Sequence, residues 1–164
     1  MKYLSALLFL PLLLMMGCGG DENDCGGEVP TLEEAIAERN TDNLPVQTFD
    51  VPNSDISFQY IIVAPGDAQR PSLADSVTVN YRGSLTDLTQ VFDETNPSGD
   101  EPDSFGLGGL IPGWQLGIPL IGEGGEIILF LPSELAYGAR GVPESIICPG
   151  ADLVFDIELV GIIN

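Results

Sequence analysis

The side chains that could do chemistry in this chain of 164 residues are aromatic rings, hydroxyls and carboxylates, because the sequence contains no histidine. A Ser-His-Asp triad, a Cys-His nucleophile pair and a His-ligated zinc site are therefore excluded. The three cysteines have no CxxC spacing, which argues against a cysteine metal site. The remaining candidates lie in six short motifs that follow one another along the chain: Val77–Leu85, Val91–Thr95, Phe105–Gly108, Leu110–Trp114, Pro132–Gly138 and Leu153–Leu159.

These six motifs, in this order and at this spacing, closely resemble the FKBP-type peptidyl-prolyl cis-trans isomerases. Each motif alone carries little information, but the ordered series covers residues 55–164, about two thirds of the chain. The resemblance implies an isomerase that accelerates rotation about X–Pro bonds in proline-containing polypeptides while exported proteins fold. A non-catalytic chaperone or peptide-binding module on the same fold stays open as the alternative.

Rotation about an X–Pro bond requires no group transfer. The barrier of about 18–20 kcal/mol exists because the amide nitrogen lone pair is delocalised in the planar bond. The twisted transition state has lost that charge separation, so a dry, apolar pocket favours it over the planar ground state. No nucleophile, metal or cofactor is needed, and we expect none.

The resemblance implies that an aromatic bowl grips the proline ring. Trp114 would form the floor of this bowl. Its walls would be formed by Tyr81, Phe92 and Phe155, and its apolar lining by Leu110 and Ile111. A module that only binds peptides need not keep all of these residues. Their joint presence therefore favours an enzyme over a binding module.

The polar groups of the expected site lie around this bowl. The resemblance implies that the backbone N–H of Ile111 and the hydroxyl of Tyr137 each bind a substrate carbonyl. Asp93 would lie at the rim beside Tyr81 and shape the electrostatics at the twisted bond. Ile147 is expected to keep the pocket-facing position of its family counterpart.

Several positions depart from the family pattern. Asp103 and Ser104 stand where the family commonly has an aromatic residue that lines the pocket, so one wall looks thinned. Val142 stands where some members carry histidine, and Cys148 replaces a proline in the loop after Tyr137. The family's macrolide inhibitors remain ligands that the resemblance implies, but these departures leave macrolide affinity and sequence preference open.

Hydrophobic periodicity indicates which elements position these residues. Residues 58–63 and 127–131 are typical of apolar strands, whereas 76–81 and 153–160 alternate as half-buried strands do. Residues 112–118 are compatible with one short helix that has Pro112 in its first turn. We therefore predict an α+β domain in which an antiparallel sheet of five to six strands wraps around one short helix, as in the FKBP-like fold.

A second, N-terminal helix is expected before this domain. Thr31 and Glu34 have the spacing of a capping box, and Leu32, Ala35 and Ile36 share one helical face. The predicted organisation is a short helix with a polar lead over residues 30–54, followed by the isomerase domain over 55–164.

The first 17 residues are typical of a signal peptide. Lys2 gives a positive start, and residues 4–16 are almost entirely apolar, a run too short for a span of roughly 20 residues. The run closes on Gly17 and Cys18, which resembles the bacterial lipobox. We expect an exported protein held on a membrane by lipid on Cys18, and Gly19 favours the outer membrane. An ordinary cleaved signal with a chance cysteine is the alternative.

The rest of the chain is strongly acidic. After removal of residues 1–17, four arginines face 25 acidic residues, a formal charge of −21. The electrostatic field of so acidic a protein argues against binding to nucleic acid or to an anionic membrane surface. Residues 18–29 are expected to form an acidic tether to the lipid.

The two other cysteines are candidates for a disulfide. With Cys18 acylated, Cys25 and Cys148 remain in an oxidising compartment. A bond between them would link the tether to the loop beside the pocket; two free thiols are the alternative.

Overall fold

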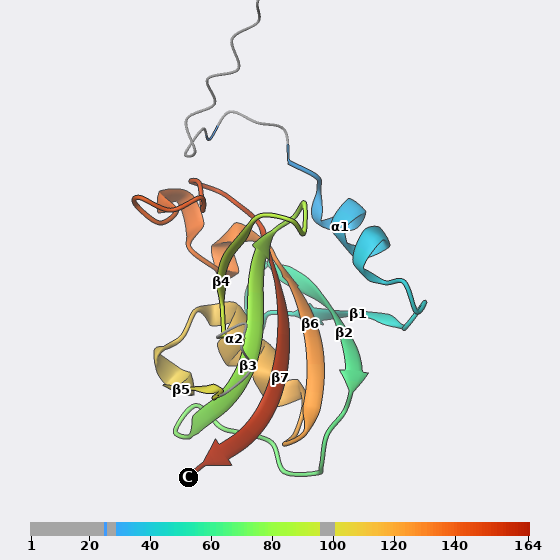
Figure 1. Cartoon of the computed structure of the whole chain (residues 1–164), viewed down its shortest axis with the longest axis vertical. Helices are drawn as coiled ribbons and strands as arrows, with labels where there is room; N and C mark the ends of the chain where they lie inside the picture. The colour runs from blue at the N-terminus through green and yellow to red at the C-terminus, as the bar shows by residue number, and fades with distance from the viewer. Residues whose placement is uncertain (1–24, 26–28, 96–100) are drawn as a thin grey trace, which may run out of the picture.

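The computed structural model describes residue 25 and residues 29–95 and 101–164 of the chain (Figure 1). The predicted signal peptide, Cys18 and most of the predicted tether lie outside these residues. Within the described part, no helix has the length and apolar character needed to cross a membrane.

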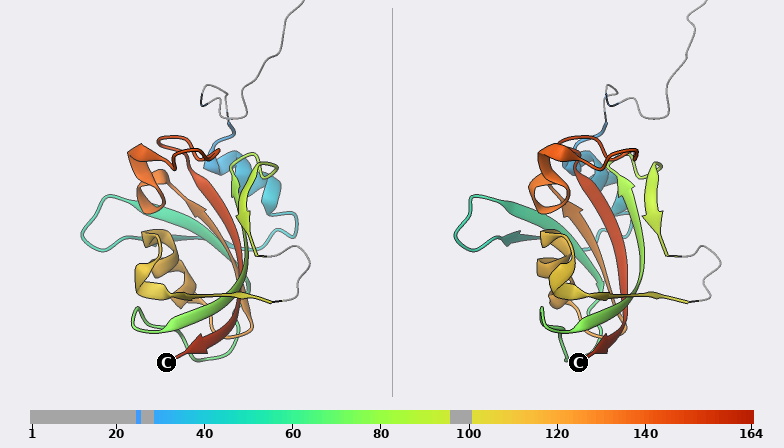
Figure 2. Two further views of the ribbon diagram at one scale, coloured as in Figure 1. Left: turned by 60° about the vertical axis from the view of Figure 1, so that its left-hand side comes forward. Right: turned by 90° about the vertical axis from the view of Figure 1, so that its left-hand side faces the viewer.

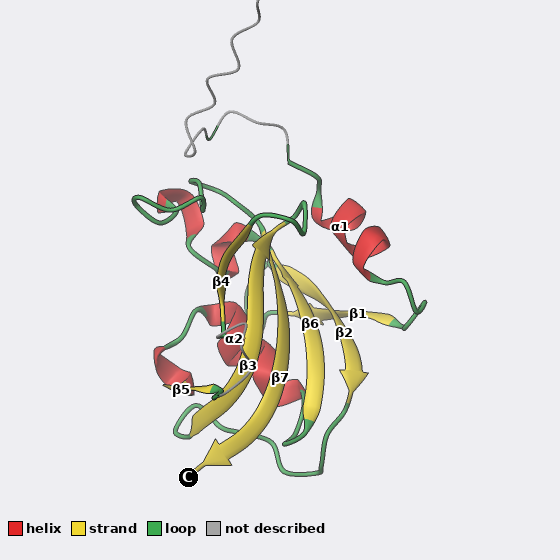
Figure 3. Cartoon of the chain, in the orientation of Figure 1, coloured by secondary structure: helices red, strands yellow, loops and turns green. Residues whose placement is uncertain are grey.

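A single antiparallel sheet of seven strands forms the body of the domain (Figures 1 and 3). The strands follow the order β1-β2-β6-β7-β3-β4, and β5 pairs with β3. Their bounds are β1 Val46–Asp50, β2 Ser57–Ala64, β3 Ser76–Leu85, β4 Val91–Glu94, β5 Asp103–Gly106, β6 Gly125–Leu131 and β7 Leu153–Ile163.

The predicted antiparallel sheet on a short helix is confirmed, but the predicted number of strands was too low. Residues 46–50, expected in the polar lead, pair with β2 as strand β1. The four residues 103–106 pair with β3 as strand β5. Neither segment has a strong hydrophobic alternation of its own, so its partner strand decides its conformation.

Helix α2 (Pro112–Gly117) lies against the concave face of the sheet, as the side views show (Figure 2). Pro112 begins the helix, and Pro119 lies in a following 3-10 turn, η2 (Ile118–Leu120). A Cβ atom on Gly117 would lie only 2.6 Å from Cδ1 of Leu129 on β6. The helix therefore approaches the sheet this closely because position 117 has no side chain.

The main core fills the space between α2 and the sheet. Leu107 is fully buried there. Three further 3-10 turns complete the described helical elements: η1 (Leu107–Gly109), η3 (Ser133–Leu135) and η4 (Gly138–Arg140).

Helix α1 (Leu32–Arg39) covers part of the opposite face of the sheet (Figure 2). The predicted capping box is present, with Thr31 and Glu34 bonded reciprocally. This second cluster is built from alternate residues of the central strands and two residues of α1: Ala35, Ile36, Ile61, Ile128, Phe130 and Val154. The central strands are apolar on both faces because both faces are covered.

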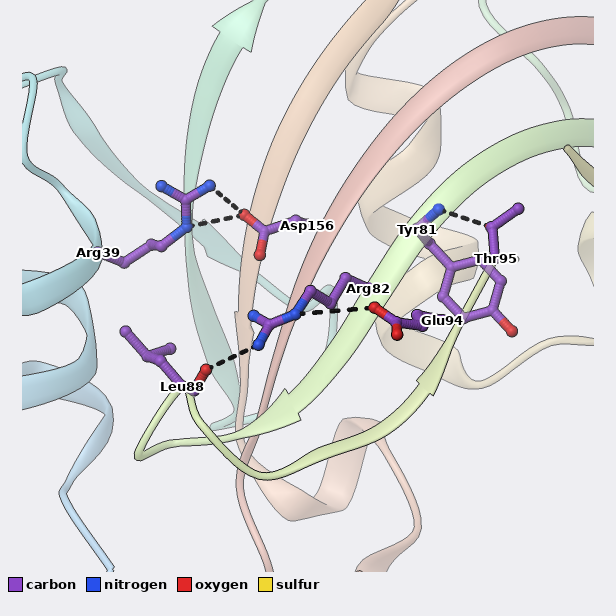
Figure 4. Close-up of polar contacts among 7 residues, drawn as sticks. All are labelled: Arg39, Tyr81, Arg82, Leu88, Glu94, Thr95 and Asp156. Carbon is purple, nitrogen blue, oxygen red and sulfur yellow. Dashed lines mark hydrogen bonds and ion pairs between the residues drawn. The ribbon is translucent and has the colours of Figure 1, made fainter. Parts of the chain in front are cut away.

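A polar contact fixes the end of α1. The Arg39 guanidinium donates hydrogen bonds of 2.9 and 2.6 Å to Oδ1 of Asp156 on β7 (Figure 4). Both side chains are partly exposed, so this ion pair orients the helix more than it stabilises the fold.

Candidate active site

A cavity of about 190 Å³ opens between α2 and the strands β3, β4, β5 and β7. Eight of the nine residues expected to bind substrate line it, and one further residue, Phe105, joins them. The lining consists of Tyr81, Phe92, Asp93, Phe105, Leu110, Ile111, Trp114, Tyr137 and Phe155. The fold thus brings together residues that are spread over more than 70 positions of the sequence.

Trp114 lies at the bottom of this cavity, with only 5% of its surface exposed. Three aromatic rings meet the indole nearly at right angles. Its ring centroid lies 5.2 Å from that of Tyr81, 5.4 Å from that of Phe155 and 6.3 Å from that of Phe105. Edge-to-face pairs are the favoured arrangement of aromatic rings, so the bowl is stable without a ligand.

A β-bulge explains why two consecutive residues of β4 both face the cavity. Neighbouring residues of a regular strand point to opposite faces. Here Gly83 on β3 pairs with Asp93, whereas Ser84 pairs with Val91, so Phe92 is the extra residue on β4. The bulge turns the side chains of both Phe92 and Asp93 toward the cavity.

Gly83 provides the space for one aromatic wall. A Cβ atom there would lie 2.6 Å from Cε2 of Phe92 and 2.9 Å from Cε1 of Phe155. The two rings, 5.5 Å apart between centroids, therefore lie directly over the backbone of β3. Any larger residue at position 83 would displace them.

Tyr81 and Asp93 form a direct pair at the rim. The Tyr81 hydroxyl donates a hydrogen bond of 2.7 Å to Oδ2 of Asp93. The backbone N–H of Tyr81 donates to Oγ1 of Thr95 at 2.9 Å, which ties the end of β4 to β3 (Figure 4). Burial, followed by the bond to Asp93 and the charges of Asp93 and Asp103, raises the pKa of the Tyr81 hydroxyl well above its usual range.

The segment before α2 brings Leu110 and Ile111 to the cavity. Ile111 is the N-cap of the helix, and its carbonyl accepts hydrogen bonds from the N–H groups of Trp114 and Gln115. The Gln115 side chain donates in turn to the carbonyl of Leu110 at 2.7 Å. The helix therefore holds residues 110 and 111 in place through its own first turn.

Tyr137 lies at the outer edge of the cavity and is 39% exposed. The preceding turn η3 is held by Asp152, whose Oδ1 accepts a hydrogen bond of 2.9 Å from the backbone N–H of Ser133. Burial, and secondly the charge of Asp93, raises the pKa of the Tyr137 hydroxyl. The hydroxyl therefore stays protonated and able to donate at neutral and mildly alkaline pH.

Ile147 does not line the cavity as the sequence had led us to expect, and Phe105 lines it without having been predicted there. Ile147 is 4% exposed and packs in the main core, and it is absent from the cavity lining. Its backbone carbonyl accepts a hydrogen bond from Val142, which folds the loop inward. Phe105 supplies a wall that we assigned to no residue. The signal for it was present, since Phe105 begins one of the six motifs.

The cysteines at positions 25 and 148 form a disulfide in the structure, with their Cα atoms 5.6 Å apart. The bond joins Cys25, in the predicted tether, to the loop that follows Tyr137. The two cysteines are 123 positions apart in the sequence.

A second cavity, of about 530 Å³, lies beside α1 on the opposite face of the sheet. Its polar groups are largely paired with one another, as in the bonds from Arg39 to Asp156 and from Asn80 to Glu158. It has no stacked aromatic floor, and it is therefore a weaker candidate despite its size. No group of three metal-ligating side chains occurs among the residues with described coordinates.

Comparison with known proteins identifies a family. The family model for FKBP-type peptidyl-prolyl cis-trans isomerases matches residues 67–160. The FKBP-type isomerase FkpA of Escherichia coli K12 is 45% identical over 112 residues, which cover 68% of this chain and 40% of that protein. Outer membrane protein MIP of Legionella longbeachae is 39% identical over 105 residues, covering 64% of this chain and 44% of that protein.

Solved structures show the same fold. The crystal structure of FkpA from E. coli superposes with a TM-score of 0.66 at 39% identity, covering 80% of this chain and 57% of that one. A peptidyl-prolyl cis-trans isomerase from Pseudomonas syringae gives 0.62 at 29% identity, covering 85% of this chain and 100% of that one. The predicted FKBP-like fold is confirmed. The chain spans 40% of the length of FkpA.

Proposed function

Because the chain belongs to the FKBP-type peptidyl-prolyl cis-trans isomerase family, we propose that it accelerates cis-trans rotation about X–Pro bonds in polypeptides. The observation that carries this proposal is the aromatic bowl over Trp114. Its volume of about 190 Å³ is below the roughly 300–1,000 Å³ of sites for drug-sized ligands. It suits a single small ring such as the pyrrolidine of proline.

The bowl would act on the substrate by exclusion of water. Aromatic faces cannot replace the hydrogen bonds that water makes to the planar, polar amide, so they favour the twisted state. The N–H of Ile111 and the hydroxyl of Tyr137 would bind carbonyls on either side of the proline and orient the peptide. The Tyr81 hydroxyl is already bonded to Asp93, so these two residues would shape the rim and leave the carbonyls to other donors.

An isomerisation assay on a proline peptide tests this proposal. We expect acceleration over the uncatalysed rate at micromolar protein, and no acceleration would contradict the enzyme. A folded Trp114→Ala/Asp93→Ala double variant should lose turnover, whereas unchanged turnover would place the site elsewhere. Glu38→Gln on the exposed side of α1 is the control. A protein that binds the same peptides without acceleration would be the non-catalytic chaperone or peptide-binding module.

Export and lipid attachment form the second part of the proposal. An apolar leader that ends at Gly17-Cys18 supports cleavage before Cys18 and acylation of its thiol. A similar relative is named an outer membrane protein, which agrees with an outer-membrane location. Metabolic labelling with a fatty acid should mark the full-length protein in bacteria, and Cys18→Ala should remove the label. A labelled Cys18→Ala variant, or an unlabelled parent, would contradict the anchor.

The disulfide would limit the distance between the active site and the membrane. Cys25 lies seven positions after the lipid-bearing Cys18, and seven residue-to-residue steps reach at most about 25 Å. The bond to Cys148 would therefore hold the loop next to Tyr137 within that reach. Proline-containing substrates would be met close to the lipid surface.

Macrolide inhibitors are proposed to compete for the same bowl. Asp103 and Ser104 stand where the family resemblance implies an aromatic side chain, so we expect weak inhibition. Asp103→Phe should strengthen it; an unchanged inhibition constant would show that this wall does not contact the inhibitor.

A further inference from the structure

Asp103 lies on the cavity side of β5. Directly paired residues of antiparallel strands point to the same face of a sheet. Asp103 pairs with Val79, and Phe105 pairs with Val77. Both valines are fully buried in the concave core, and Phe105 lines the cavity. The side chain of Asp103 therefore leaves β5 on the same side as the aromatic wall.

Asp103 is also a neighbour of Tyr81. Tyr81 follows Val79 by two positions on β3, which makes it the diagonal neighbour of Asp103, at about 7 Å. The charge of Asp103 contributes to the raised pKa of the Tyr81 hydroxyl, after burial and the nearer carboxylate of Asp93. Asp93 and Asp103 thus lie on β4 and β5, the two strands that pair with β3 at this edge of the sheet.

Cations do not neutralise this part of the rim. Arg82, adjacent to Tyr81, points to the opposite face and lies 4.0 Å from Glu94. Arg39 is bonded to Asp156 beyond the sheet, and Arg70 donates to the backbone carbonyl of Asp67. Arg140 is exposed, three residues beyond Tyr137, and forms no ion pair with any described residue. Two carboxylates therefore face a substrate without a fixed counter-charge.

We propose that Asp103 is a specificity-determining residue that, with Asp93, makes the cavity select X–Pro substrates carrying lysine or arginine next to the proline. This inference rests on the proposed isomerase function. The bowl would bind the proline ring, and the cationic side chain would extend over the rim between the two carboxylates. An aromatic residue at position 103 would add apolar surface and no such charge preference.

The size of the preference follows from Coulomb's law. Opposite unit charges about 7 Å apart in water correspond to about a threefold gain in affinity. Glutamate at the same substrate position would lose a similar factor, so the ratio of kcat/KM for lysine over glutamate peptides should reach about tenfold. Raising the ionic strength to about 1 M shortens the Debye length to roughly 3 Å and should remove most of this ratio.

NMR exchange measurements of cis-trans rates in short proline peptides, which need no coupled protease, test the inference. Lysine, leucine or glutamate is placed before the proline in one series and after it in another. We expect lysine to exceed leucine, and leucine to exceed glutamate, in at least one series. Asp103→Asn removes this charge for both substrates and should lower the lysine-to-glutamate ratio about tenfold, and Asp103→Lys should lower it further. Glu38→Gln removes the same charge on the far side of the sheet and should leave the ratio unchanged.

The outcomes separate the two proposals. Equal acceleration of lysine, leucine and glutamate peptides in both series would overturn the specificity and leave the isomerase intact. An undiminished ratio in Asp103→Asn would overturn the role of this residue. No acceleration of any peptide would overturn the isomerase function itself. Because Asp103 is exposed, both variants should fold, and circular dichroism checks this.

Discussion

Replacing Gly117 by alanine would test whether the closeness of α2 to the sheet positions the floor of the site. The backbone at Gly117 is helical, with φ −83° and ψ −45°, so helix propensity alone predicts a gain of up to about 1 kcal/mol. Packing predicts the opposite result. The new Cβ would lie 2.6 and 2.7 Å from the two Cδ atoms of Leu129, and 3.3 Å from its Cγ atom.

Both methyl groups of Leu129 would overlap with the new Cβ atom, and the Leu129 side chain is fully buried. Either Leu129 must repack or the helix must move, and because Leu129 is fully buried we expect the helix to move. Carbon atoms prefer separations of about 3.5–4.0 Å, which requires a shift of about 1 Å. We expect a loss of about 1–3 kcal/mol in the free energy of unfolding. Trp114 moves with the helix, and we expect kcat/KM to fall about tenfold to a hundredfold.

Urea unfolding and the isomerisation assay measure the two effects. Gly109→Ala is the matched control, because a Cβ there meets nothing within 4 Å; it should change neither quantity appreciably. Leu129→Ala removes all three overlapping atoms, so its combination with Gly117→Ala should restore part of the activity that Gly117→Ala loses. If Gly117→Ala behaved like Gly109→Ala, the close approach of α2 would not set the site.

Three further predictions concern the disulfide and the titrating groups. A Cys25→Ser/Cys148→Ser variant should lose about 2–4 kcal/mol of unfolding free energy in urea, and equal stability of oxidised and reduced parent protein would contradict this. Burial raises the pKa of Asp152, so the folded state takes up a proton more readily than the unfolded one. The charged form is therefore penalised in the folded state. Above about pH 5, Asp152→Asn should stabilise the fold by less than about 1 kcal/mol, and this gain should vanish near pH 3. A gain that grew on acidification would contradict the sign. Since the pKa values of both Tyr81 and Tyr137 are raised, kcat/KM should stay flat up to about pH 10, and a tyrosine-like fall below pH 9 would refute the environment described here.

The bowl residues could be predicted from the sequence because the types and order of its motifs resemble those of the FKBP-type isomerases. The predicted aromatic set was Trp114 with Tyr81, Phe92 and Phe155, and such apolar rings are groups that a chain without histidine can use on an amide bond. The capping box at Thr31 and Glu34 was equally predictable, since its hydrogen bonds join residues only three positions apart. Local patterns of this kind carry their own physical cause.

The strand count and two site residues could not be predicted in this way. Strand β1 forms because β2 offers an edge, and β5 because β3 does. Ile147 packs in the core because its loop folds inward through a bond from Val142. Phe105 reaches the bowl through its register opposite Val77. Each of these outcomes depends on a partner distant in the sequence.

The aromatic set, the acidic charge and the order of the motifs are therefore properties of the sequence by itself. The tertiary structure decided how they meet. A bulge opposite Gly83 turns both Phe92 and Asp93 toward the cavity, and the missing side chain of Gly117 lets Trp114 approach the sheet. Strand register and the closeness of a helix to a sheet are set by contacts across the fold, and no spacing along the chain encodes them.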